Sequence, residues 1–175
     1  MTQQSGKALI IIDPQNDYFP EGKYPLWDIS NTLEKIKKAI ERANQQDTPI
    51  ILVQHIASRD ISVAPFFNEG TQGAAIHPEI TAAAPNAIIV TKTFADSFEQ
   101  TNLDQVLSEQ GINTLLLCGM MTQNCVTHTA ISKQAEKYQV VVLADCCTTV
   151  DEMLHNIALN AISPRITLLP AKQVI

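Results

Sequence analysis

Three residues with complementary chemistry follow three apolar runs of the sequence. The run "ALIII" leads into Asp13, "AIIVT" leads into Lys92, and "TLLLCG" precedes a polar turn that contains Cys125. A nearby ammonium group and a helix N-terminus both favour the thiolate form of a cysteine. A carboxylate within hydrogen-bond reach can accept the thiol proton and later return it to a leaving group. These residue types predict a covalent acyl-transfer hydrolase with Cys125 as nucleophile, Asp13 as base and Lys92 as electrostatic support.

Each of these residues also has an ordinary structural explanation. An aspartate before a proline commonly caps a turn, as Asp13 would before Pro14. A lysine at a strand end is usually solvated, and a cysteine beside apolar residues usually packs in the core. Two other classes of protein remain open as well: a thiol redox protein that uses Cys125, which would lack a C-x-x-C pair, and a binding module that retains the pocket without catalysis.

The fold class follows from a regular alternation of patterns. Short β-branched apolar runs, each typical of a strand buried on both faces, lie at residues 8–12, 49–54, 87–91, 114–119, 140–145 and 166–169. Helical patterns lie at residues 31–45, 99–110, 123–137 and 151–161. This alternation predicts a three-layer α/β/α sandwich, Rossmann-like, with a mainly parallel sheet of about six strands. We expect one domain, residues 1–175.

The three residues are expected to lie at the edge of the sheet where ligands bind in this type of fold. In open parallel sheets, ligands bind beyond the carboxyl ends of the strands. Asp13, Lys92 and Cys125 all follow strand ends, and their coincidence at one edge favours catalysis over three separate structural roles. Residues 56–86 form the longest irregular segment, and long loops in compact domains are often covers or interface elements.

Composition excludes several classes of function. The formal net charge is −6 and the sequence has no basic run, so binding to nucleic acid or to an anionic membrane surface is not expected. No apolar segment approaches the roughly 20 residues of a membrane span. The first residues resemble a strand and not a signal peptide, which predicts a cytoplasmic protein. The four cysteines include no C-x-x-C pair, so we expect free thiols and no structural zinc.

Four segments carry a resemblance to a known family. The sequences "ALIIIDPQNDYF", "TKTFADSF" and "LLLCGMMTQNCVTHTA" resemble the three motifs of the isochorismatase-like cysteine hydrolase superfamily, and "EGTQGAAIHPEI" resembles a fourth segment. The resemblance implies a catalytic triad of Asp13, Lys92 and Cys125. It also implies a cis peptide bond between Met120 and Met121, with the N–H groups of Met121 and Cys125 as the oxyanion hole.

The resemblance implies more about chemistry than about a substrate. Family members attack an amide, imide or ureido carbonyl with the thiolate, whereas isochorismatase proper cleaves a vinyl ether and some of its relatives lack the cysteine. The presence of Cys125 favours an amide or ureido C–N bond, with the vinyl-ether hydrolase as the alternative. Relatives form dimers and larger assemblies, so we expect a homo-oligomer that acts on a small molecule without a cofactor.

Residues around the expected site lead to two further predictions. Nicotinamidases of this superfamily bind a metal ion through a D-x-H motif, but the corresponding stretch here is "VQH", with Val53 in place of the aspartate. We therefore predict no metal ion, read His55 as structural, and disfavour nicotinamide as the substrate. The expected substrate-binding residues are Gln15, Phe19, Trp27 and Phe66. An exposed turn position is an equal alternative for Gln15, and loop anchoring or a subunit contact is an equal alternative for the three aromatic residues.

Overall fold

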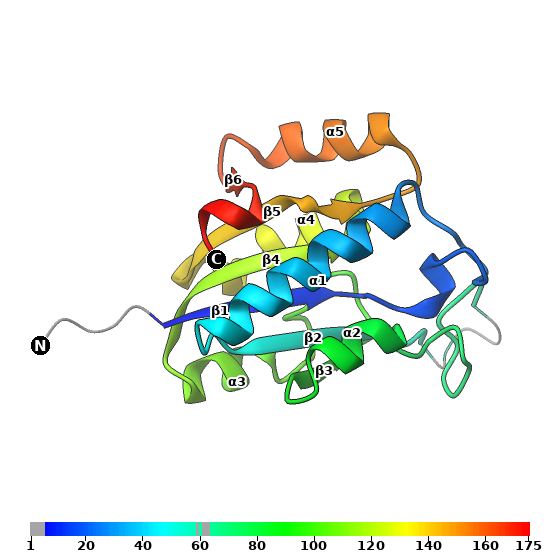
Figure 1. Ribbon diagram of the computed structural model, residues 1–175, viewed down its shortest axis with the longest axis horizontal. Helices are drawn as coiled ribbons and strands as arrows, with labels where there is room; N and C mark the ends of the chain where they lie inside the picture. The colour runs from blue at the N-terminus through cyan, green and yellow to red at the C-terminus, as the bar shows by residue number, and fades with distance from the viewer. Residues whose placement is uncertain (1–5, 59, 61–63) are drawn as a thin grey trace, which may run out of the picture.

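Six parallel strands form the centre of the protein (Figure 1). The computed structural model describes residues 6–58, 60 and 64–175. The strands are β1 (Gly6–Ile12), β2 (Ile50–His55), β3 (Ile88–Lys92), β4 (Ile112–Met120), β5 (Gln139–Thr148) and β6 (Thr167–Leu169). They are arranged in the order β3-β2-β1-β4-β5-β6, and every neighbouring pair is parallel. The predicted Rossmann-like sheet is confirmed.

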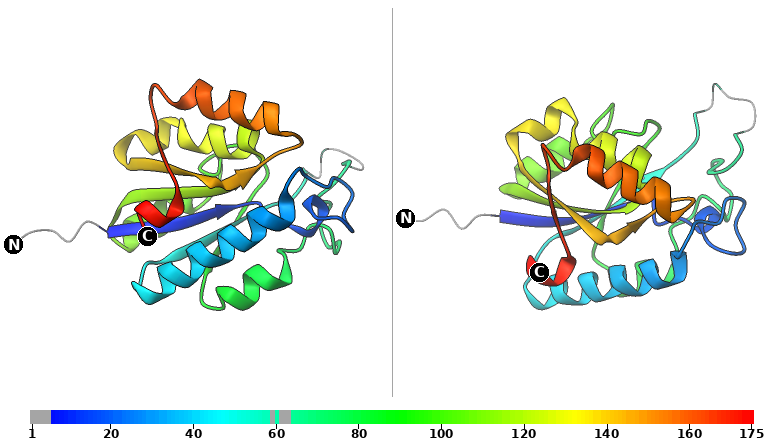
Figure 2. Two further views of the ribbon diagram at one scale, coloured as in Figure 1. Left: turned by 45° about the horizontal axis from the view of Figure 1, so that its top comes forward. Right: turned by 90° about the horizontal axis from the view of Figure 1, so that it is seen from above.

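Helices cover both faces of the sheet and complete the three predicted layers. Helices α1 and α2 pack together on one face, and α4 and α5 lie on the opposite face (Figure 2). The helices are α1 (Ile29–Gln45), α2 (Pro78–Ala83), α3 (Leu103–Glu109), α4 (Thr127–Ala130) and α5 (Glu152–Ile162). None of the helices in the described residues combines the length and apolarity that a membrane span needs.

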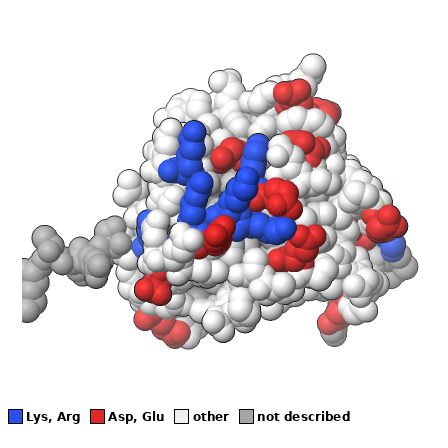
Figure 3. Space-filling model, in the orientation of Figure 1, with Lys and Arg blue, Asp and Glu red and all other residues white. Residues whose placement is uncertain are grey.

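The outer face of α1 carries mixed charge. Figure 3 shows Lys and Arg side chains lying among Asp and Glu side chains on the face that α1 and α2 cover. Lys37 on α1 contacts Glu34 at 2.9 Å and Glu79 on α2 at 2.6 Å, which links the two helices. These ion pairs are exposed, so each contributes little to stability.

Two predicted elements differ from the structure. The helix expected over residues 123–137 is three shorter pieces: a π-helix at Thr122–Val126, then α4, then a 3-10 helix at Lys133–Lys137. Ser132 caps this last piece by accepting a hydrogen bond from the Gln134 N–H group, and such a local bond competes with a continuous helix. The segment 56–86, which was expected to be irregular, contains α2. The first residue of this helix is Pro78, and the side chain of the preceding His77 caps its N-terminus.

The prediction that every strand is buried on both faces is correct for the centre and wrong for the edges. Residues 8–12 of β1 are fully buried, because β1 has a strand on each side and a helix layer on each face. β3 lies at one edge, and its Ile88 and Ile89 are 37% and 52% exposed. β6, at the other edge, is also partly exposed. Apolar composition alone does not distinguish a central strand from an edge strand.

The strand order determines where a site can form. The chain moves from β1 to β2 and β3 on one side, then returns to place β4 on the other side of β1. Ligands of open parallel sheets bind where the strand order reverses, beyond the carboxyl ends of the strands. Here that point lies between β1, which leads into Asp13, and β4, which leads into the turn with Cys125.

Gly119 allows these two central strands to approach closely near that point. Its φ is +118°, and a Cβ atom added there would lie 2.1 Å from the Ile12 carbonyl oxygen. Gly111, after α3, also has a positive φ of +65°, but its Cβ would meet no atom within 4 Å. Both glycines have a left-handed backbone conformation, but only Gly119 is also closely packed. A comparison of substitutions at the two positions therefore distinguishes the effect of conformation from the effect of packing.

We expect Gly119→Ala to lower the free energy of unfolding by about 2–5 kcal/mol, because it combines left-handed strain with a backbone clash. Gly111→Ala is the matched control and should cost about 1–2 kcal/mol from conformation alone. Urea unfolding followed by circular dichroism measures both values. Equal losses in the two variants would show that β1 and β4 separate easily at this point.

Candidate active site

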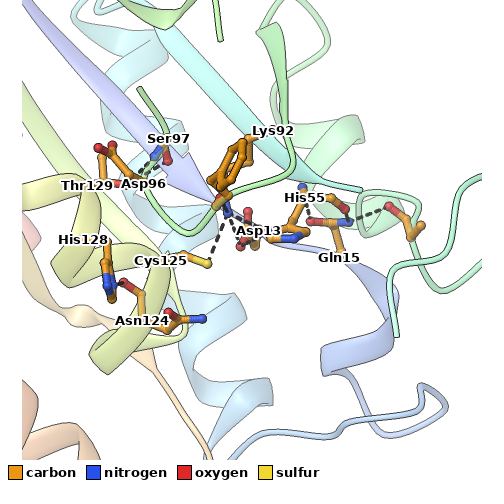
Figure 4. Close-up of polar contacts among 12 residues, drawn as sticks. Asp13, Gln15, His55, Lys92, Asp96, Ser97, Asn124, Cys125, His128 and Thr129 are labelled. Carbon is orange, nitrogen blue, oxygen red and sulfur yellow. Dashed lines mark hydrogen bonds and ion pairs between the residues drawn. The ribbon is translucent and has the colours of Figure 1, made fainter. Parts of the chain in front are cut away.

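Asp13, Lys92 and Cys125 lie together at the carboxyl end of the sheet (Figure 4). The Lys92 Nζ atom is 3.1 Å from Asp13 Oδ2 and 3.2 Å from Cys125 Sγ. All three residues are at least 98% buried. A carboxylate, an ammonium group and a thiol from distant parts of the chain thus meet inside the protein.

The lysine ammonium group is the centre of this cluster. Besides Asp13 and Cys125, Lys92 Nζ contacts His55 Nδ1 at 2.8 Å and the Phe94 carbonyl oxygen at 3.0 Å. Burial acts to lower the pKa of Lys92, but the Asp13 carboxylate and Cys125 outweigh it, and the net shift is upward. Lys92 is therefore a fixed positive charge. Its three hydrogens have three hydrogen-bond acceptors, namely His55 Nδ1, the Phe94 oxygen and the Cys125 sulfur.

The Asp13 carboxylate has no such set of partners. It is fully buried, and neither of its oxygens has a hydrogen-bond donor among the described residues. Its contact with Lys92 is an ion pair at 3.1 Å without hydrogen-bond geometry. A buried oxygen without a donor is costly, so Asp13 is ready to accept a proton or an N–H group at this site.

The structure opposes the two effects that the sequence analysis expected to favour the thiolate form of Cys125, a nearby ammonium group and a helix N-terminus. Burial and the Asp13 carboxylate raise the pKa of the thiol well above its ordinary range, and the Lys92 ammonium group lowers it only in part. Cys125 also lies within the π-helix, and α4 after it has only four residues. So short a helix has little dipole to offer. Together these effects favour the thiol form of Cys125 at rest.

One pair of buried hydroxyl groups holds the loop after Lys92 against the segment after Cys125. Thr129 on α4 donates to Ser97 Oγ at 2.8 Å and accepts from the Ser97 N–H group at 3.0 Å. Both side chains are fully buried. Ser97 lies in the loop that follows Lys92, so these bonds fix the distance between the ammonium group and the sulfur.

Gln15, predicted as a substrate contact, has a side chain that is bonded to the surrounding backbone. Its side-chain amide donates to the carbonyl oxygens of His55 at 2.7 Å and Ala74 at 2.8 Å, and its oxygen accepts from the His55 N–H group at 2.8 Å. Both amide hydrogens are used inside the protein, and the residue is fully buried. Gln15 therefore ties the end of β2 to the loop after β1.

Asp17, which the sequence analysis gave no role, organises the surrounding loops. Its carboxylate accepts hydrogen bonds from the Phe67 N–H group at 2.8 Å and the Lys23 N–H group at 3.2 Å. Gly73 lies so close that a Cβ atom there would be 2.1 Å from Asp17 Oδ1. The sequence feature that could have indicated this role is the second aspartate of "DPQND", because it is not followed by a residue pattern typical of a capped turn.

The predicted aromatic contacts are dispersed. Phe19 packs against the His77 ring, with centroids 4.1 Å apart, and Trp27 lies 5.8 Å from the His155 ring. Phe66 belongs to an aromatic cluster in which its ring centroid is 5.6 Å from that of Tyr18. A substrate contact by Phe66 stays a prediction. Substrate contacts by Phe19 and Trp27 also stay predictions, and the ring contacts of both residues are compatible with the alternative of loop anchoring.

The turn before Cys125 is defined by Met121. The peptide bond between Met120 and Met121 is cis. The Met121 carbonyl oxygen accepts hydrogen bonds from the N–H groups of Asn124 at 3.0 Å and Val126 at 3.3 Å. The assignment of the Met121 and Cys125 N–H groups to an oxyanion hole stays a prediction.

The donor atoms near Lys92 also resemble a metal site in their spacing. Single atoms of Asp13, His55 and Cys125 lie within 4.8 Å of one another. However, the Lys92 ammonium group contacts all three side chains at 2.8–3.2 Å. A positive charge thus already stands where a metal ion would bind, and a second cation there would be repelled. These residues do not fit a metal ion.

Comparison with known proteins identifies the family of this chain. The model of the isochorismatase domain matches residues 7–169. The chain belongs to the isochorismatase family. It is 35% identical over 142 residues to the isochorismatase family protein YddQ of Bacillus subtilis, covering 81% of this chain and 77% of the relative.

Other members of the isochorismatase family extend the comparison. A crystal structure of an Oleispira antarctica protein assigned as an isochorismatase hydrolase superposes with a TM-score of 0.87 at 32% identity, covering 99% of this chain and 98% of that one. A nicotinamidase of Acinetobacter baylyi is 26% identical over 187 residues, covering 86% of this chain and 85% of the relative. The family relationship therefore spans nearly the whole fold.

Alkylation should report the opposed effects of the two charges on the thiol. Because Lys92 lowers the Cys125 pKa and Asp13 raises it, Lys92→Met should slow the reaction of Cys125 with iodoacetamide and Asp13→Asn should accelerate it. Each unit of thiol pKa changes the rate roughly tenfold at neutral pH. Peptide mass spectrometry against time measures the rates.

The buried Cys118, whose pKa burial also raises, is the control in the same experiment. We expect it to react more slowly than Cys125 in all three proteins. Uniform labelling of the cysteines, or equal rates in the two variants, would contradict the charge arrangement at the site.

Proposed function

We propose that this isochorismatase-family protein is a metal-independent cysteine hydrolase that cleaves an amide or ureido C–N bond of a small molecule. The observation that carries the proposal is the buried Asp13 carboxylate, which has no hydrogen-bond donor among the described residues and lies beside a thiol held by the Lys92 ammonium group. A base, a nucleophile and a fixed positive charge are the parts that covalent acyl transfer requires.

In the first half of the reaction, Asp13 acts as a base and then as an acid. Asp13 accepts the Cys125 proton while the sulfur attacks the substrate carbonyl carbon and forms a C–S bond. The tetrahedral intermediate collapses, the C–N bond breaks, and Asp13 returns the proton to the leaving nitrogen. The products of this half are a free amine or ammonia and a thioester on Cys125.

In the second half, water replaces the amine. Asp13 accepts a proton from water, the resulting oxygen attacks the thioester carbonyl, and the C–S bond breaks. The proton then returns to the sulfur, which restores the Cys125 thiol and releases an acid. The N–H groups of Met121 and Cys125 would stabilise the negative oxygen in both halves.

Lys92 contributes charge and not a proton in this scheme. Its hydrogens are already directed at His55, at the Phe94 carbonyl oxygen and at the Cys125 sulfur. A buried ammonium group at 3.2 Å stabilises a sulfur that becomes negative during attack, and it does so without reorganisation. The resting thiol consequently becomes a nucleophile only when Asp13 takes its proton.

The alternatives fit these contacts less well. A role in thiol–disulfide exchange requires a resolving cysteine, and Cys125 belongs to no C-x-x-C pair. A vinyl-ether hydrolase has no need of a nucleophilic thiol held beside a base. The name of the Acinetobacter baylyi relative, nicotinamidase, supports a C–N bond, although Val53 argues against the metal-dependent form of that activity.

The homo-oligomer is part of the proposal as well. Helix α5 exposes Met153 at 73% and Ile157 at 58%, and apolar side chains exposed on one helix favour association.

Replacement of Cys125 tests the proposed reaction. In a panel of amides and ureido compounds screened by ammonia release, both Cys125→Ala and Cys125→Ser should lower turnover by about 10³-fold or more, because no other thiol reaches Asp13. Thermal denaturation should show that both variants remain folded. Cys118→Ala provides the matched control, and its kcat should stay close to that of the original protein.

The outcomes of this screen separate the alternatives. Full activity of Cys125→Ala on the responsive substrate would overturn the covalent mechanism. Hydrolysis of a vinyl ether in preference to every amide would replace the proposed substrate class.

Metal removal tests the proposal that the enzyme needs no metal ion. Dialysis against EDTA should leave kcat unchanged, because the Lys92 ammonium group supplies the positive charge at the site. The assay of the responsive substrate before and after dialysis is the measurement. Loss of activity that zinc restores would contradict a metal-independent mechanism.

A further inference from the structure

His55 stands between the strands that carry the charged pair. It is the last residue of β2 and the register partner of Lys92 on the edge strand β3. To reach Asp13 after β1, the Lys92 side chain must therefore pass His55. Figure 4 shows the His55 ring beside the Lys92 ammonium group and Asp13. Its Nδ1 atom is 2.8 Å from Lys92 Nζ and 3.9 Å from Asp13 Oδ2.

The backbone of His55 is fixed independently of its ring. The Gln15 amide accepts a hydrogen bond from the His55 N–H group and donates one to the His55 carbonyl oxygen. Two bonds from one buried side chain leave the residue little freedom to shift. The ring is therefore held against Lys92 by the scaffold.

Hydrogen-bond chemistry determines the tautomer of this ring. An ammonium group has hydrogens but no lone pair, so it can only donate. His55 Nδ1 must therefore be the acceptor, and the ring proton must lie on Nε2. A protonated imidazolium has no acceptor and cannot make this contact.

We propose that His55 is a positioning residue that holds the Lys92 ammonium group beside Asp13 and Cys125, and that protonation of His55 breaks this contact and switches the site off in acid. The kinetic part of this inference rests on the proposed function, whereas the tautomer and the contact do not.

The groups around the ring determine when it is protonated. Burial lowers the His55 pKa, the Lys92 ammonium group lowers it further, and the Asp13 carboxylate opposes both. Cys125 lies within the same 4.8 Å cluster and is an uncharged thiol at rest, and the ring of Phe67, 5.8 Å away, is apolar. Protonation would place two positive charges 2.8 Å apart, so Lys92 would have to leave its present position.

Nuclear magnetic resonance of 15N-labelled protein tests the contact without any substrate. We expect two-bond imidazole correlations to show His55 as the Nε2–H tautomer, with a pKa below the ordinary value near 6.5. In Lys92→Met the His55 pKa should rise. His77 is the internal control, because its lowered pKa depends on burial and on Lys37 and Glu79, not on Lys92.

Either of two results would overturn the inference. One is an Nδ1–H tautomer in the original protein, which can be read even if Lys92→Met fails to fold. The other is a His55 pKa that Lys92→Met leaves unchanged.

A pair of substitutions at His55 tests the kinetic part. His55→Leu removes the acceptor and should lower kcat by about 10–100-fold, the effect of losing one hydrogen bond to a charged group, with little change in KM. In His55→Asn the side-chain oxygen can occupy the place of Nδ1 but cannot be protonated. The His55→Asn variant should therefore have most of the kcat that His55→Leu loses, and the acid limb of its pH profile should lie at lower pH.

A merely structural role predicts a different pattern. Both variants would then lose stability and kcat together, with the acid limb in its original place, and the inference would fail. Its failure is distinguishable from failure of the proposed function, which would appear as turnover that persists in Cys125→Ala while the tautomer measurement still holds.

Discussion

The buried ion pair of Asp13 and Lys92 is the interaction on which the site depends. Two charges removed from water carry a desolvation cost that their attraction offsets only with good geometry and additional hydrogen bonds. Lys92 obtains those bonds from His55, Phe94 and Cys125, but the Asp13 oxygens receive no hydrogen bond from the described residues. Loss of either partner would leave an uncompensated buried charge, at a cost of about 3–5 kcal/mol.

The surrounding structure serves to hold this pair. Gln15 connects the segment after β1 to the end of β2, and Ser97 and Thr129 join the loop after β3 to α4. Gly119 permits the close approach of β1 and β4. These contacts involve residues that neighbour the three charged or reactive groups, and they use buried polar atoms or close backbone packing. They therefore restrict the movement of Asp13, Lys92 and Cys125.

The raised pKa of Cys125 affects the reactivity of its sulfur towards oxidants and alkylating reagents. Oxidation and alkylation proceed through the thiolate, and burial and Asp13 raise the pKa of Cys125. Burial and Asp13 thus oppose oxidation and alkylation of the sulfur. This differs from cysteine enzymes in which a long helix and an imidazolium favour the thiolate at rest. In the proposed mechanism, the carboxylate that raises the pKa of the thiol also accepts its proton.

The sequence by itself determined the alternation of strands and helices, the parallel sheet and the identity of the residues at the strand ends, because periodicity and residue chemistry are local properties. It could not distinguish the edge strand with Ile88 and Ile89 from a central one, since exposure depends on neighbours that the chain supplies elsewhere. Only the tertiary structure placed His55 beside Lys92 and turned Gln15 inward. Only the tertiary structure raised the pKa of the Cys125 thiol, because a pKa depends on burial and on charges brought close in space.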